Sequence, residues 1–165
     1  MREIVLILHD IRSAHNVGSL LRTAECLGVN KVLLTGYTPY PIEKNDVRLP
    51  HIANKTAARL HKTALGAEAY IQWEHVEDIM QAMHILDQDG FSLIALEQSP
   101  KSVDISSWMP PDKIAILLGR EVEGIANNLL DRCNQIIEIP MLGRKESLNV
   151  VQAAAIILFR SRFAD

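Results

Sequence analysis

Three separated stretches of the chain combine glycine with polar side chains, and each could contribute to a ligand site. Their polar members are Asn16, Arg22, Glu121, Ser147 and Asn149. An arginine can hold a phosphate through two parallel hydrogen bonds. Backbone amides and small polar groups at the start of a helix can hold a phosphate or the carboxylate of a small molecule. These residue types indicate a site for an anionic group, provided that the fold brings the three stretches together.

The first stretch is predicted to lie on a helix that runs from residue 17 to residue 27 and ends near Gly28. Its inward stripe is formed by Val17, Leu20, Leu21 and Ala24. At about 100° per residue, the opposite side carries Gly18, Ser19, Arg22 and Glu25. Arg22 is therefore expected on the side away from the core. A surface arginine that pairs with Glu25 or with water is the alternative, and many exposed charges have no further role.

The second stretch, Gly119 to Gly124, follows an apolar strand predicted at residues 113–118. A strand that ends in glycine and turns again at a second glycine indicates close approach of the backbone to a ligand. The spacing matches neither the dinucleotide fingerprint G-x-G-x-x-G nor the phosphate loop G-x-x-x-x-G-K-S/T, so a nucleotide-dependent oxidoreductase loses support. Glu121, at the mouth of this loop, could orient a basic group or a water molecule, or it could be a solvated acid.

The third stretch leads into a helix at residues 148–159 whose apolar side chains nearly encircle it. Such a helix is expected to be buried on both sides. Ser147 is predicted to cap its N-terminus, and Gly143 permits a backbone turn just before it. An ordinary capped core helix after a loop would show the same pattern.

Strands and helices alternate along the chain, which predicts an α/β domain with a mostly parallel sheet and helices on both faces. Strands are expected at residues 4–8, 31–34, 69–73, 91–96, 113–118 and 136–139. Further helices are expected at residues 52–65 and 76–86, with an irregular, proline-containing loop at 37–50. Polar loops at 10–16, 97–99, 119–124 and 140–149 follow strands. Ligands of parallel sheets bind beyond the carboxyl ends of the strands, so these four loops are predicted to form one pocket.

Length and composition limit the possible classes of protein. The 165 residues are expected to form a single domain, 1–165, with no N-terminal RNA-binding extension, and no apolar run approaches the ~20 residues of a membrane span. The N-terminus lacks the features of a signal peptide. The two cysteines, Cys26 and Cys133, show no metal-ligand spacing. We therefore expect a cytoplasmic protein without a membrane segment or a metal.

A net charge of −3 excludes a chain that binds nucleic acid through its overall charge, so a polyanionic partner must meet local basic groups. The candidate positions are Arg12 with His15, then Lys55, Arg59 and Lys62, and finally Arg144 with Lys145. The middle three recur at i, i+4 and i+7 and would share one helix face. A solvated surface face is the alternative for such a pattern.

Taken together, the three stretches resemble the ordered motifs of the SpoU/TrmH family of RNA ribose 2′-O-methyltransferases, within the SPOUT superfamily. The motifs read N-x-G-x-x-x-R-T-A from Asn16, L-G-x-E-x-x-G-I from Leu118 and I-P-M-x-G-x-x-x-S-L-N-V from Ile139. The segment K-T-A-L-G-A from Lys62 also resembles family sequence. Any one motif alone is a weak signal, but the three in order and at this separation are a strong one.

The resemblance implies a C-terminal trefoil knot, S-adenosylmethionine bound within it, and a homodimer whose site is completed across the interface. The cofactor-binding positions by resemblance are Leu96, Gly119, Ile139 and Leu148. Those grouped around the transferred methyl and the target ribose are Asn16, Arg22, Glu121, Ser147 and Asn149. The expected partner is RNA, with tRNA favoured over rRNA by family analogy. The candidates for RNA contact are Arg12, His15, Lys55, Arg59 and Arg144.

By resemblance, Arg22 is the candidate base that removes the proton from the ribose hydroxyl. A guanidinium has a pKa above ~12, which makes it a poor base in an ordinary environment. The hypothesis is therefore that Arg22 at least clamps the target phosphate and polarises the hydroxyl, with base action open. Two alternatives remain: methylation of a base atom, as in other SPOUT proteins, and a non-catalytic module that associates with RNA or the ribosome.

Overall fold

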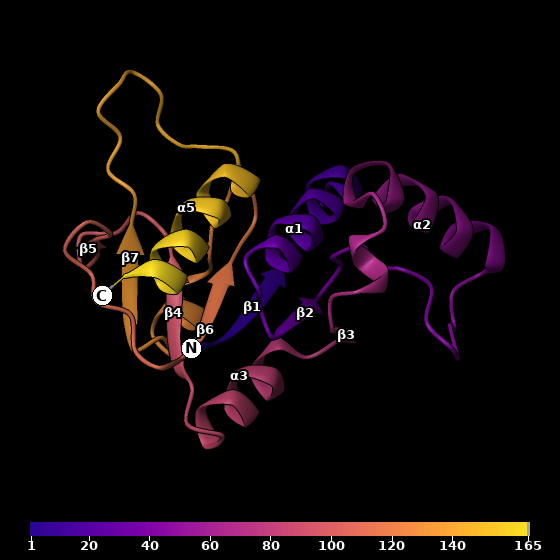
Figure 1. The fold of residues 1–165 in the computed structure, drawn as a ribbon, viewed down its shortest axis with the longest axis horizontal. Helices are drawn as coiled ribbons and strands as arrows, with labels where there is room; N and C mark the ends of the chain where they lie inside the picture. The colour runs from indigo at the N-terminus through magenta and orange to yellow at the C-terminus, as the bar shows by residue number, and fades with distance from the viewer. Residues whose placement is uncertain (165) are drawn as a thin grey trace.

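Seven strands form one parallel sheet, and helices cover both of its faces (Figure 1). The computed structural model describes residues 1–164. The strands are β1 (Glu3–His9), β2 (Lys31–Thr35), β3 (Trp73–Val76), β4 (Ser92–Leu96), β5 (Val103–Asp104), β6 (Lys113–Leu118) and β7 (Gln135–Glu138). The helices are α1 (Ala14–Cys26), α2 (Pro50–Ala64), α3 (Ile79–Gln88), α4 (Asn127–Leu130) and α5 (Val150–Phe163), with a 3-10 turn η1 (Ala67–Ala69). The predicted α/β class is confirmed.

The central strand β1 separates two hydrophobic cores, because side chains alternate between the faces of a strand. Ile4, Leu6 and Leu8 lie in the core that includes residues of α1 and α5. Val5 and Ile7 lie in the opposite core, with residues of α3. All five are at most 4% exposed, and full burial of an aliphatic side chain stabilises the fold by about 1.5–3 kcal/mol. The continuous aliphatic run is thus a strand covered on both faces, as predicted.

The strand order is β3-β2-β1-β6-β4-β7-β5, and all six pairings are parallel. Residues Glu3 to Leu8 of β1 pair with Lys113 to Leu118 of β6. On its other side β1 pairs with β2, which the chain reaches through α1. The carboxyl ends of β1, β6, β4 and β7 therefore meet at one edge of the sheet, where the sequence predicted a pocket.

Two predicted elements begin later than expected. Residues 69–73 do not start a strand, because Leu65 and Gly66 adopt positive φ angles of 52° and 94° and lead into η1. The strand, β3, begins at Trp73 and includes Val76, which was predicted to start the next helix. That helix, α3, begins only at Ile79, with Asp78 as its N-cap. The short elements β5 and α4 were not predicted, since two and four residues are too few to show a period.

The start and the burial of α5 also differ from expectation. Asn149, not Ser147, is the N-cap: its side chain accepts a hydrogen bond from the amide of Val151 at 2.9 Å. One face of α5 is buried in the core, through Ala154, Ile157, Leu158 and Ser161. Ile156, Phe159 and Phe163 on another face are 40–61% exposed, so the single chain covers α5 on one side only.

The end of α5 is held by arginine side chains that bind backbone carbonyl groups far away in the sequence. Arg162 donates to the carbonyl oxygens of Leu27, at 3.1 Å, and of Arg2, at 2.7 Å. Arg2 in turn donates to the carbonyl oxygen of Ala164 at 2.7 Å. These contacts tie the C-terminal helix to the start of β1 and to the end of α1. Within residues 1–164, none of the helices combines the length and the apolar character that a membrane crossing demands.

Helix α2 packs on α1, beyond the edge of the sheet (Figure 1). The contact is closest at Gly18, where a Cβ atom would lie 2.2 Å from the carbonyl oxygen of Leu60 and 2.3 Å from Oγ1 of Thr63. Gly18 is consequently buried, which corrects the expectation that it faces away from the core. Thr63 also donates a hydrogen bond to the carbonyl oxygen of His15 at 2.8 Å, which fixes the two helices against each other.

Gly18→Ala is expected to lower the free energy of unfolding by about 1–3 kcal/mol, because the added methyl group must push α2 away. In an exposed helix the same change would instead stabilise the protein by roughly 1 kcal/mol, so the sign is diagnostic. The measurement is urea unfolding. Ser19→Ala, one position along the same helix, is the control and should change stability by less than about 0.5 kcal/mol. A Gly18→Ala variant as stable as the wild type would contradict the close packing.

Candidate ligand site at the carboxyl edge of the sheet

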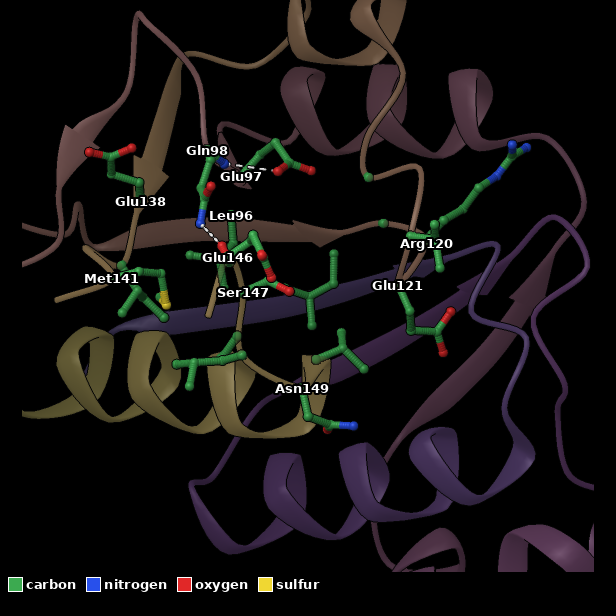
Figure 2. A pocket seen from close by; sticks show the side chains of 18 residues that line it. Leu96, Glu97, Gln98, Arg120, Glu121, Glu138, Met141, Glu146, Ser147 and Asn149 are labelled. Atoms are coloured by element: carbon green, nitrogen blue, oxygen red, sulfur yellow. Dashed lines mark hydrogen bonds between the residues drawn. The ribbon is translucent and has the colours of Figure 1, made fainter. Parts of the chain in front are cut away.

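A cavity of about 500 Å³ opens at the carboxyl ends of β4, β6 and β7 (Figure 2). This volume lies within the range of small-molecule sites in proteins. Its lining includes every position assigned to cofactor binding by resemblance, namely Leu96, Gly119, Ile139 and Leu148. It also includes three of the polar candidates, namely Glu121, Ser147 and Asn149. Parallel strand order thus brings together residues that lie up to 53 positions apart in the sequence.

Asn16 joins this group through a hydrogen bond. Its side-chain nitrogen donates to Oε1 of Glu121 at 3.2 Å, across 105 positions of sequence. Asn16 lies in the first turn of α1, where the Ser13 side chain accepts from its backbone amide and caps the helix. The contact connects the loop after β1 with the loop after β6. Four of the five polar candidates are therefore gathered at the cavity or bonded to its lining.

Arg22 is the exception, because its side chain is exposed on α1 and is not part of the cavity lining in the single chain. The other basic candidates are likewise exposed on the surface. They are Arg12, His15, Lys55, Arg59 and Arg144. Nη2 of Arg12 lies 3.9 Å from Oε1 of Glu123. Lys55 and Arg59 lie on α2, and Arg144 lies in the loop between β7 and α5.

Close backbone packing shapes the loop from Gly119 to Gly124. A Cβ atom at Gly119 would lie 2.9 Å from the carbonyl oxygen of Gly124. Gly124 itself has a φ of 70° and packs against the carboxylate of Glu97. That carboxylate accepts hydrogen bonds from the amides of Ile125, at 3.0 Å, and Gln98, at 2.9 Å. Both glycines are required by packing within the chain, whereas the sequence pattern was interpreted as close approach of the backbone to a ligand. The bracing role of Glu97 gave no signal beyond its place in a polar loop.

The loop between β7 and α5 forms the remaining wall of the cavity. Gln98 reaches it from the end of β4, with its side-chain nitrogen donating to the carbonyl oxygen of Glu146 at 2.7 Å (Figure 2). The lining contains four carboxylates, of Glu97, Glu121, Glu138 and Glu146, against a single cation, Arg120. Such a lining favours a ligand that carries positive charge. No cluster of three or more metal-ligating His, Cys, Asp or Glu residues occurs within residues 1–164.

A polar network that the sequence did not reveal lies beside the cavity. Arg120 donates to Oδ2 of Asp10 from Nη2 at 2.9 Å and from Nε at 3.2 Å. The amide of Tyr37 donates to Oδ1 of Asp10 at 3.1 Å, and Nε2 of His9 lies 3.4 Å from Oδ2. Asp10 is only 6% exposed. Burial is the largest influence on the pKa of Asp10 and raises it, but the hydrogen bonds and charges of Arg120, Tyr37 and His9 together hold that pKa below its ordinary value.

The fold and the cavity define an α/β domain with a candidate ligand cavity at the carboxyl edge of a parallel sheet. The model of the SpoU rRNA Methylase family matches residues 3–159, and the chain belongs to this family. The chain is 28% identical over 156 residues to a tRNA (guanosine(18)-2′-O)-methyltransferase of Borreliella burgdorferi, with 94% of this chain and 64% of that protein covered.

Two further comparisons concern the sequence of a second relative and the fold. The chain is 29% identical to the 23S rRNA (guanosine-2′-O-)-methyltransferase RlmB of Neisseria meningitidis, with 96% of this chain and 58% of that protein covered. The crystal structure of an AdoMet-bound rRNA methyltransferase from Sinorhizobium meliloti superposes with a TM-score of 0.80 at 23% identity, covering 97% of this chain and 56% of that one. The chain spans 64% and 58% of the lengths of these two curated relatives and 56% of the length of a third.

The lowered pKa of Asp10 predicts how the stability of the folded protein depends on pH. In the folded protein its carboxylate stays ionised below its ordinary pKa of 3.8, so the unfolded chain binds more protons in this range. Asp10 therefore contributes stability above its unfolded pKa, and this contribution is lost as the pH falls through the folded pKa. We expect the urea midpoint of the wild type to fall more steeply than that of Asp10→Asn between about pH 5 and about pH 3. Parallel curves for the two proteins would contradict the ionised pair.

Proposed function

We propose that this chain transfers a methyl group from S-adenosylmethionine to a ribose 2′-hydroxyl of RNA. The observation that carries the proposal is the convergence of the second and third motifs on one cavity, with Asn16 of the first motif bonded to Glu121 at its rim. Membership of the SpoU family and the 2′-O-methyltransferases among the relatives support the same reaction. Because the chain spans only part of the length of those relatives, its own substrate has to be measured.

The cavity suits S-adenosylmethionine in size, surface and charge. Apolar side chains of Leu96, Ile139 and Leu148 offer a surface for the adenosine, and the half-buried backbone of Gly119 lines the cavity beside them. The carboxylates around the cavity complement the sulfonium and the ammonium group of the cofactor. When bound, the sulfonium supplies an activated methyl group, so the protein has to hold the ribose oxygen in line with it and assist the loss of its proton.

Glu121, Ser147 and Asn149 are proposed to orient the ribose and its phosphate at the rim of the cavity. Each of the three is exposed on the chain, which leaves it accessible to a macromolecular substrate. Asn16 holds the carboxylate of Glu121 through the 3.2 Å hydrogen bond. Asn149 also caps α5, so its side-chain oxygen is committed to the amide of Val151 and its nitrogen is the group that can donate to substrate.

A homodimer is proposed to bring the guanidinium of Arg22 to this site. In the single chain Arg22 is exposed and lies outside the cavity lining, and Arg120, the one cation of the lining, is paired with Asp10. The apolar side chains of Ile156, Phe159 and Phe163 on α5 offer a surface for a second copy. In this arrangement Arg22 clamps the target phosphate and polarises the hydroxyl, which matches the two-pronged geometry of arginine better than action as a base.

Arg22→Ala is expected to reduce methyl transfer by about a thousandfold, the range measured when a group that stabilises developing charge is removed. Binding of S-adenosylmethionine by calorimetry should stay within a factor of about two, because Arg22 lies outside the cavity lining. Arg22→Lys keeps the charge but loses the two-pronged contact, so it should restore only a small part of the rate. Arg132→Ala removes another exposed arginine and serves as the control. Turnover by Arg22→Ala close to that of the wild type would refute the assignment.

The nature of the product tests the proposal as a whole. Labelled S-adenosylmethionine is incubated with the protein and total cellular RNA, and the RNA is digested to nucleosides. We expect label in a 2′-O-methylated nucleoside, with transfer RNA as the favoured acceptor over ribosomal RNA. Label in a methylated base would show that the target is a base atom and not the ribose hydroxyl. Binding of RNA without any transfer would instead indicate a non-catalytic RNA- or ribosome-associated module.

RNA contact is proposed to extend over the exposed face of α2, where Lys55, Arg59 and Lys62 follow one another at helical spacing. Each phosphate contact releases counterions, so the affinity for RNA should fall steeply with salt. Lys55→Ala with Arg59→Ala should weaken RNA binding and flatten the slope of log K against log salt concentration by roughly one to two units. Lys113→Ala, at the amino end of β6 and away from α2, is the control and should leave the slope unchanged. Salt-independent binding by the wild type would exclude this surface.

A further inference from the structure

Two ion pairs connect the loop after β1 with the loop after β6, and they differ in burial. In the first, Nη2 of Arg120 lies 2.9 Å from Oδ2 of Asp10, whose side chain is 8% exposed. In the second, Nη2 of Arg12 lies 3.9 Å from Oε1 of Glu123, and these side chains are 74% and 50% exposed. Exposed pairs contribute little because water and salt screen them, whereas a hydrogen-bonded pair with a buried partner is costly to break. The pair that contains the buried Asp10 carboxylate is the one able to fix the loops.

The carboxylate of Asp10 is held in place from two further directions. Its backbone has a φ of 57°, a region that non-glycine residues rarely adopt and that Asp and Asn tolerate best. The amide of Tyr37 binds Oδ1, and a Cβ atom at Gly36 would lie 2.0 Å from that same oxygen. Gly36 leaves the space that the carboxylate occupies. The ends of β1 and β2 together thus present one fixed, ionised acceptor to the loop after β6.

Arg120 connects the fixed carboxylate of Asp10 to the loop that lines the cavity. It lies between Gly119 and Glu121, both of which line the cavity, and its carbonyl oxygen accepts a hydrogen bond from the amide of Gly124 at 3.2 Å. The side chains of Arg120 and Glu121 leave the loop in different directions, with that of Glu121 toward the side where Asn149 lies (Figure 2). Anchoring the guanidinium to Asp10 therefore sets the orientation of this turn, and with it the position of Glu121.

We propose that Asp10 and Arg120 are positioning residues, which hold the Gly119–Gly124 turn in the conformation that forms one wall of the cofactor cavity. Neither residue is one of the polar candidates of the three motifs. Asp10 lies outside the cavity lining, whereas Arg120 is part of it, so the order of the ligand-free turn is the readout that separates positioning from direct contact. As far as it concerns cofactor affinity, this inference rests on the proposed function. The order of the turn in the ligand-free protein does not, so the two can be tested separately.

A double-mutant cycle of Asp10→Asn, Arg120→Met and the double variant tests the pair. Asn tolerates the positive φ of position 10 and can still accept from the Tyr37 amide, so the first change removes mainly the charge. Each single change should raise the Kd for S-adenosylmethionine by about tenfold, with Arg120→Met the larger because it leaves a buried carboxylate unpaired. The double variant should bind no worse than Arg120→Met, since the two residues act as one unit.

Hydrogen exchange of the ligand-free protein gives the second readout. The amides of Gly124 and Ile125, which bind the Arg120 carbonyl and the Glu97 carboxylate, should exchange faster in both single variants. Arg120→Lys restores a charge and one hydrogen bond and should recover part of the affinity and of the protection. Glu123→Gln, which breaks the exposed pair that joins the same loops, should change neither quantity.

Unchanged cofactor Kd and unchanged exchange at Gly124 and Ile125 in Arg120→Met would overturn the inference. So would additive effects in the cycle, or a general loss of thermal stability without selective exchange in the turn. Arg120→Lys keeps a charge beside the buried carboxylate, so it should fold even where Asp10→Asn or Arg120→Met does not, and its Kd and its exchange in the turn then test the pair. If the wild type itself does not bind S-adenosylmethionine, the proposed function fails, while the exchange measurements still decide whether the pair orders the turn.

Discussion

The site depends above all on parallel pairing of β1, β6, β4 and β7. These strands all run in the same direction, and both faces of the sheet are buried. The loops that leave their carboxyl ends therefore meet at one edge of the sheet. β1 and β6 meet along six consecutive residue pairs in the middle of the sheet. Without this pairing, Leu96, Gly119 and Leu148 would be three unrelated positions in the sequence. The apolar interior thus serves the site by fixing where polar loops begin.

Pairing brings the loops together, but it does not set their conformations. That is done by side chains of neighbouring loops, which satisfy backbone amides and carbonyl groups near the cavity. Glu97 accepts from the amides of Gln98 and Ile125, and Gln98 donates to the carbonyl oxygen of Glu146. Each loop around the cavity is therefore braced by another. A change in one bracing group should be felt through the shape of the whole cavity, which is the logic of the Asp10–Arg120 inference.

Two features of the single chain bear on the proposed dimer. The exposed rings of Phe159 and Phe163 lie next to each other on α5, tilted by 41° with centroids 4.8 Å apart, on a helix whose other face is in the core. Arg22 is exposed on α1, and α1 packs against α5. The proposed dimer would account for both at once, because covering α5 would place a second copy close to α1. The trefoil knot implied by the resemblance stays a prediction.

The sequence by itself determined the architecture, because strand and helix periods report local burial directly. The run at residues 4–8 and the helical stripe of Val17, Leu20 and Leu21 each predicted their element and its buried side. The polar loops at strand ends then followed from the rules of parallel sheets. The sequence pattern failed where turn geometry mattered, as at Leu65 and Gly66, whose positive φ angles delay β3.

Only the tertiary structure decided which polar residues meet. Nothing in the sequence pairs Asp10 with Arg120, and the resemblance grouped Asn16 and Glu121 at one site without showing their hydrogen bond. Each pair spans more than a hundred positions and depends on the register of β1 with β6. The burial of Gly18 by α2 and the exposure of one face of α5 are of the same kind. A sequence period records that a side chain prefers to be buried, but the neighbour that buries it is chosen by the packing of the whole chain.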